Sequence, residues 1–82
     1  MGLGKLKNNS TVMITYTLEW ENGLTENDVL QPKEEVEINC GDEKAKLCHR
    51  SDGGIYGACP ANSKTFEAED YYLLLEDGEY EN

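Results

Sequence analysis

The chain has 82 residues, enough for one small domain whose stability rests on a single modest core. Seventeen acidic and seven basic side chains give a formal net charge of −10, which repels phosphate backbones and anionic membranes and attracts basic partners. Direct nucleic-acid binding and membrane association are therefore not expected. Because no export signal and no apolar run of about 18 residues is present, a cytoplasmic location is expected.

The first regular pattern follows residues 1–9, which we expect to form an N-terminal extension. From Ser10 to Gly23 large apolar side chains occupy every second position. A strand points successive side chains to opposite faces, so this pattern predicts a strand with one strongly apolar face. We expect that face to form the centre of the core, and its members are Val12, Ile14, Tyr16, Leu18 and Trp20.

Turn residues divide the next part of the chain. Asn22-Gly23 predicts a turn, and residues 24–28 are expected to continue as a polar loop. A short strand is expected at Val29 and Leu30, and Pro32 should stop it because proline cannot donate to a ladder.

Residues 34–59 predict a meander of three neighbouring strands. The pair Gly41-Asp42 suits a hairpin loop that would place Val36 opposite Leu47. A second turn at residues 52–54 would place Leu47 opposite Cys59. Both registers keep the apolar side chains on one face, so the expected core gains Val36, Ile38 and Leu47.

The C-terminal part is predicted to contain two further strands, in residues 64–68 and 71–76. The run YYLLL is typical of a strand covered on both faces, although Ser63 and Gly78 could instead begin and end a helix over residues 64–76. The chain therefore predicts an all-β fold, a small antiparallel β-sandwich or open barrel of six to seven short strands. Its single domain should span residues 10–76, followed by an acidic tail at 77–82.

The three cysteines and the single histidine are the only groups that suggest chemistry. A zinc site built from Cys40, Cys48, Cys59 and His49 lacks closely spaced cysteine pairs, and strand neighbours 48 and 49 should point to opposite faces. Catalysis by Cys59 with His49 would need the two within about 3 Å. We expect no catalytic residue, metal or cofactor, with Cys40 and Cys59 buried, Cys48 partly exposed, and all three thiols free.

A mixed acidic and aromatic surface near the C-terminus is the strongest candidate for binding. From residue 67 onward the chain has seven acidic side chains and no basic one, with tyrosines among them. Tyrosine is favoured at protein interfaces. The expected partner-binding residues are Glu67, Glu69, Asp70, Tyr72, Glu76, Asp77 and Tyr80. The alternative is that the acidity only keeps a small domain soluble.

In size, charge and lack of catalytic groups, the chain resembles small phage-encoded inhibitors of host defence, which include DNA mimics and anti-CRISPR proteins. The resemblance is compositional and covers no motif. It implies a viral, non-catalytic protein that acts in the host cytoplasm on a basic partner, such as a nucleic-acid-binding protein. A structural or accessory β-module that forms a homo-oligomer through an edge strand, such as residues 44–50, is the second expectation. A zinc-binding domain is the third.

Overall fold

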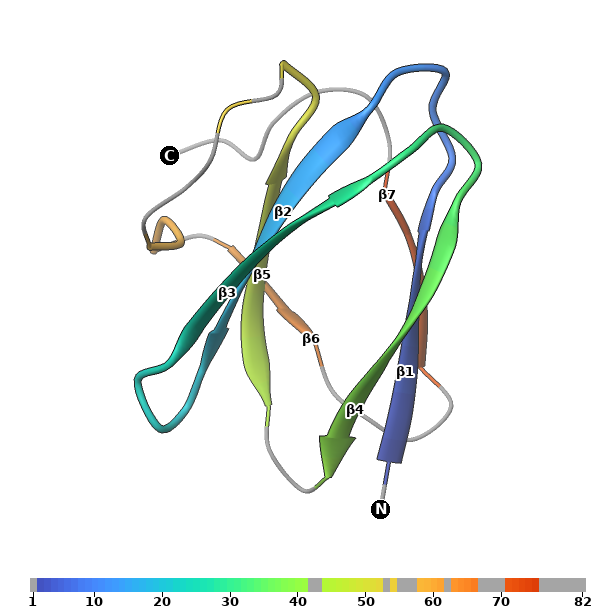
Figure 1. Cartoon of the computed structure of the whole chain (residues 1–82). Coiled ribbons are helices and arrows are strands. Elements are labelled where there is room, and N and C mark those ends of the chain that lie inside the picture. Colours follow the sequence, from blue (N-terminus) through green and yellow to red (C-terminus); the bar gives the residue numbers. More distant parts are fainter. Residues whose placement is uncertain are drawn as a thin grey trace.

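The computed structural model describes residues 2–41, 44–52, 54, 58–61, 63–66 and 71–75, with backbone alone at 2–3, 39–41, 66 and 71–75. Two sheets, with strand orders β4-β1-β7 and β3-β2-β5-β6, form the all-β fold in Figure 1. The predicted fold class is confirmed, and no helix able to cross a membrane occurs in this part of the chain. The strands are β1 (Gly2–Asn8), β2 (Ile14–Trp20), β3 (Thr25–Leu30), β4 (Glu35–Gly41), β5 (Ala45–Arg50), β6 (Lys64–Phe66) and β7 (Tyr71–Leu75).

The core lies between the two sheets and is built from alternate positions of their strands. In β2 the buried apolar residues are two apart, as the alternation predicts for a face that packs on a second sheet. Three further apolar side chains, Trp20, Val36 and Ile38, are partly buried and pack against this cluster. The buried members are Leu6, Ile14, Tyr16, Leu18, Leu30, Ala45 and Leu47.

Val12 is not a core residue, which corrects the sequence analysis. Its exposed fraction is 42%. The strand begins two residues later, at Ile14, and Val12 lies in the connection between β1 and β2, where its carbonyl accepts a hydrogen bond from Asn8 Nδ2 at 2.8 Å. The apolar alternation therefore runs beyond the strand itself.

The segment expected to be an N-terminal extension contains β1, the middle strand of the smaller sheet. β1 pairs antiparallel with β4 and parallel with β7. Leu6 is fully buried, while the exposed face pairs Lys5 with Glu37 and Lys7 with Glu35. Among the β1 side chains that the structure describes, Leu6 is the one large apolar group, and it faces inward between Gly4 and Asn8, so alternation gave little sign of this strand.

The meander predicted for residues 34–59 is wrong. β4 pairs with β1 in one sheet, whereas β5 pairs with β2 and β6 in the other, so Leu47 lies opposite Leu18 and Lys64. The predicted hairpin and the observed sandwich place the same apolar side chains toward the core. Alternation specifies the face of a strand and not its neighbour, and for that reason it did not separate the two arrangements.

The C-terminal strands are confirmed where the structure describes them. β6 and β7 are extended, so the helical alternative for residues 64–76 is wrong for 64–66 and 71–75. β3 also differs from expectation, because it begins at Thr25 in the segment predicted to be a polar loop. It ends at Leu30, before Pro32, as predicted.

Asn8 connects the two sheets through a fully satisfied buried amide. Its Nδ2 donates to the carbonyls of Val12 at 2.8 Å and Leu30 at 3.0 Å. Its Oδ1 accepts from the Ser10 backbone at 2.9 Å and the Ser10 hydroxyl at 2.6 Å. Because its side chain is inside the protein, Asn8 ties the end of β1 to the end of β3.

The second face of β2 is also covered. Thr15 and Thr17 are buried, although they lie on the face opposite the core. The Thr15 hydroxyl donates to the Gly54 carbonyl, and the Cys59 thiol donates to the Thr17 carbonyl at 3.5 Å. Gly54 and Cys59, which follow β5, therefore lie over the outer face of the larger sheet, and this explains why Thr15 and Thr17 are buried.

Candidate functional site

The β2–β3 hairpin creates an exposed edge beside the core. Its loop places Gly23 at φ 93°, a conformation that favours glycine, and Asn22 Oδ1 accepts the amide of Leu24 at 2.9 Å. Gly23 donates to the Trp20 carbonyl at 2.9 Å, and Trp20 donates to the Leu24 carbonyl at 2.8 Å. This three-residue loop sets the register in which β3 lies along β2.

β3 is an edge strand that faces solvent over nearly its whole length. Every residue from 25 to 29 is exposed, and only Leu30 is buried. β2 is its only strand neighbour within the described part of the sheet. Two apolar side chains stand at this edge, Leu24 with an exposed fraction of 63% and Val29 with 39%.

Acidic side chains occupy the positions of β3 that lie opposite the core residues of β2. Glu26 pairs with Leu18, and Asp28 pairs with Tyr16. Together with Glu34, which follows β3 in the next turn, Glu26 and Asp28 form what we call the acidic edge. Burial, and then the charges of Asp28, Glu26 and Glu34, raise the pKa of Tyr16 to about 12. Tyr16 therefore stays neutral and adds no negative charge to the acidic edge.

The only tryptophan of the chain borders the acidic edge. The Trp20 indole donates from Nε1 to Glu26 Oε2 at 3.1 Å, and its ring is half-buried against the core. This contact makes the indole a natural spectroscopic reporter of changes at Glu26.

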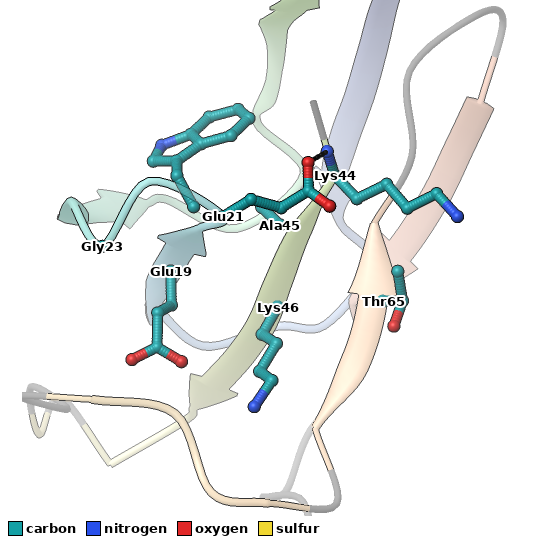
Figure 2. Close-up of a pocket in the computed structure, with 8 residues that line it drawn as sticks. Glu19, Glu21, Gly23, Lys44, Ala45, Lys46 and Thr65 are labelled. Atoms are coloured by element: carbon teal, nitrogen blue, oxygen red, sulfur yellow. Dashed lines mark hydrogen bonds between the residues drawn. The ribbon is translucent and has the colours of Figure 1, made fainter. Parts of the chain in front are cut away.

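An open depression of about 390 Å³ lies at the end of β2 and β5 (Figure 2). Charged side chains of both signs surround it, and the amide of Lys44 donates to Glu21 Oε1 at 3.4 Å. Its apolar wall is limited to the indole and Ala45, which suits a side chain of a partner better than an enclosed small molecule. The lining residues are Glu19, Trp20, Glu21, Gly23, Lys44, Ala45, Lys46 and Thr65.

The cysteines and the histidine are arranged differently from expectation. Cys48 is fully buried and Cys59 is partly exposed, the reverse of the prediction. Cys48 pairs with Thr17 on the outer face of the larger sheet, and the Cys59 thiol donates to the carbonyls of Thr17 and Lys46 at 3.5 Å, so both thiols lie on this face. His49 pairs with Tyr16 on the inner face, and for this reason Cys59 and His49 do not share a face.

Burial is the largest cause of a raised pKa at both thiols. A raised pKa lowers the fraction of thiolate, the nucleophilic form. The pair is therefore poorly suited to nucleophilic catalysis. Among the described residues, no group of three His, Cys, Asp or Glu side chains is placed to hold a metal ion.

The acidic and aromatic surface predicted near the C-terminus falls almost entirely outside the described residues. Glu67, Glu69, Asp70, Glu76, Asp77 and Tyr80 lie there, and the structure describes the backbone of Tyr72, in β7, opposite Lys5. The acidic edge was missed because residues 24–28 lack an apolar alternation. The Asn22-Gly23 turn directly after a strong strand was the signal for a returning strand.

No known protein family, curated protein or solved structure matches this chain. The acidic edge must therefore be interpreted from its own chemistry. It combines an exposed strand edge, two carboxylates that face no cation across the ladder, and a neighbouring indole.

Proposed function

We propose that the protein is a small acidic, non-catalytic binding protein that engages a basic protein partner through the acidic edge. The observation that carries the proposal is β3, where Glu26 and Asp28 stand on an exposed edge strand. The net charge of −10 would speed the approach of a basic partner, and the acidic edge would supply the contact.

Other carboxylates of the described sheets are placed differently. Glu35 and Glu37 lie opposite Lys7 and Lys5, so a cation stands beside each of them. Opposite-charge pairs of this kind across a ladder contribute roughly 0.2–1 kcal/mol to stability. Glu26 and Asp28 face Leu18 and Tyr16 instead, and this leaves their charge available to a partner.

The class of partner we favour is a protein that itself binds nucleic acid. Surfaces that bind phosphate backbones are rich in lysine and arginine, and a protein of net charge −10 complements them. A role as a phage-type inhibitor, in the manner of DNA mimics and anti-CRISPR proteins, is part of this proposal and rests on the composition of the chain.

The test compares two variants with equal loss of charge. Glu26→Gln with Asp28→Asn removes the two β3 carboxylates of the acidic edge, and Glu35→Gln with Glu37→Gln removes two carboxylates from the other sheet. Binding to a panel of purified basic nucleic-acid-binding proteins is measured at low and high salt. We expect the first variant to lose more affinity than the second, and high salt to weaken binding by the wild type. Equal effects of the two variants, or binding that is indifferent to salt, would overturn the proposal.

A second candidate function is an oligomer-forming β-module. The edge strand expected for it at residues 44–50 is wrong, because β5 pairs with both β2 and β6. The exposed Leu24 and Val29 along the β3 edge are the observation that favours it instead. Sedimentation at increasing salt separates the two candidates. An apolar self-contact strengthens or persists at high salt, whereas a monomer at all salt concentrations favours the binding protein.

A further inference from the structure

The hydrogen-bond pattern of the hairpin determines which backbone groups of β3 face outward. Trp20 and Leu24 are joined by a hydrogen bond at the turn. In an antiparallel ladder, hydrogen-bonded pairs alternate with non-hydrogen-bonded pairs. The register then makes Glu26 and Asp28 the residues whose backbone groups face β2.

The backbone groups of Thr25, Asn27 and Val29 consequently point away from β2. The outward amide of Val29 already has an acceptor, because it donates to Asp28 Oδ1 at 2.7 Å. The amides of Thr25 and Asn27, with the carbonyls of these residues, remain directed toward the open side of the strand. They are spaced to pair with one more strand.

A second copy of this chain is a poor occupant of that edge. Antiparallel pairing of two β3 strands about Asn27 would place Glu26 of each copy opposite Asp28 of the other. Like charges directly opposite each other destabilise a strand pair. The charges that disfavour self-pairing favour a neighbour that carries lysine or arginine at the same positions.

We infer that β3 takes up a basic, extended segment of the partner as an added strand, an inference that rests on the proposed function. Basic side chains at alternate positions of that segment would lie beside Glu26 and Asp28. The intervening side chains would lie beside Thr25, Asn27 and Val29, where small or apolar groups fit the half-exposed valine. Main-chain pairing would provide affinity, and the alternating charge would provide specificity.

The probe is a ten-residue peptide of alternating lysine and threonine. Its binding is measured by Trp20 fluorescence and by hydrogen exchange of the backbone amides of β3. We expect slower exchange at Thr25 and Asn27 in the complex, and a change in Trp20 emission through its contact with Glu26. A peptide of the same composition with its lysines in one block should bind more weakly and protect neither amide. Equal protection by both peptides, or none by either, would overturn the inference.

Backbone variants separate strand addition from charge attraction. Thr25→Pro removes an outward amide and every carboxylate remains, so we expect about a tenfold loss of affinity if this amide pairs with the peptide. In the peptide, N-methylation of the amides that face β3 should abolish binding, whereas methylation of the outward amides should not. This second comparison holds even if the proline variant fails to fold.

The two proposals fail in different ways. If methylation at either set of amides has the same effect while Glu26→Gln with Asp28→Asn still abolishes binding, the acidic edge binds basic partners and strand addition is wrong. If the peptide binds the charge-depleted variant as well as the wild type, the proposed function fails too.

Discussion

The pKa of Tyr16 depends on both the core and the acidic edge. Its side chain is buried, and the pKa raised to about 12 reflects burial first and the charges of Asp28, Glu26 and Glu34 next. A phenol held neutral by burial contributes nothing to the pH dependence of stability until the unfolded chain begins to ionise, near pH 10.

We expect the free energy of unfolding to fall as pH rises from about 10 to 12, by roughly 2–3 kcal/mol from Tyr16. The folded pKa lies above the unfolded value, so the stabilisation is complete below pH 10 and is lost as pH rises through the folded pKa. Denaturant unfolding of the wild type and Tyr16→Phe measures this difference, since lysine titration is common to both. Parallel pH profiles would contradict the assignment.

The same residue reports on the acidic edge. Replacing Glu26 and Asp28 with their amides should lower the pKa of Tyr16 only in part, because burial is the larger cause. Ultraviolet titration of phenol ionisation, with Tyr16→Phe as the reference that identifies the signal, measures the shift.

Cys59 should react with an alkylating reagent before Cys48, contrary to expectation from the sequence. Cys48 is fully buried, whereas Cys59 is partly exposed, and burial raises the pKa of both thiols. Peptide mapping after brief native alkylation gives the order, and labelling of the denatured protein should find three thiols. Faster labelling of Cys48 would contradict this order of accessibility.

At the scale of elements, the connection between the two sheets depends on Asn8. Replacing it with alanine leaves the buried carbonyl of Leu30 without its donor, which costs about 1–3 kcal/mol for each such group. We expect Asn8→Ala to lower the denaturation midpoint markedly. Asn8→Asp retains the acceptor for Ser10 and loses the donor, so it separates the two contributions; a wild-type midpoint for both variants would contradict this role.

Asn8 is also the first residue of a sequence motif for N-glycosylation. Residues 8–11 contain two overlapping glycosylation sequons. The Asn8 side chain is fully buried and its amide nitrogen already donates to two carbonyls. A glycan on that nitrogen is incompatible with these two hydrogen bonds and with the folded connection between β1 and β2.

For the whole molecule, we expect long-range charge and direct contact to be separable. Glu67→Gln, Glu69→Gln and Asp70→Asn together remove three of the seventeen acidic side chains. Association with a basic partner should slow and lose part of its salt dependence, while the fold is retained or slightly stabilised as like charges are removed. Stopped-flow association and dissociation rates measure this effect.

The acidic edge should behave differently from these C-terminal carboxylates. Glu26 and Asp28 are proposed to touch the partner. Glu26→Gln with Asp28→Asn should therefore also raise the dissociation rate. A dissociation rate that rises equally for both sets of substitutions would mean that the C-terminal carboxylates are contact residues as well.

The sequence alone determined the fold class and the inward faces of β2, β4 and β5. Alternation from Ile14 to Trp20 and at Val36, Ile38 and Leu47 identified side chains that the structure places in or against the core. This information is local, because successive side chains in a strand point to opposite faces whatever lies beside it. The same rule misjudged Val12, where the alternation continues beyond the strand.

Only the tertiary structure decided which strands are neighbours. β4 and β5 follow each other in the chain and belong to different sheets, β1 becomes a central strand that buries Leu6, and β3 lies at an edge. Pairing is a choice among distant segments with similar apolar faces, and the packing of the whole core selects one arrangement. The acidic edge exists because that arrangement leaves the outer side of β3 open, and no local pattern of its residues specifies this position.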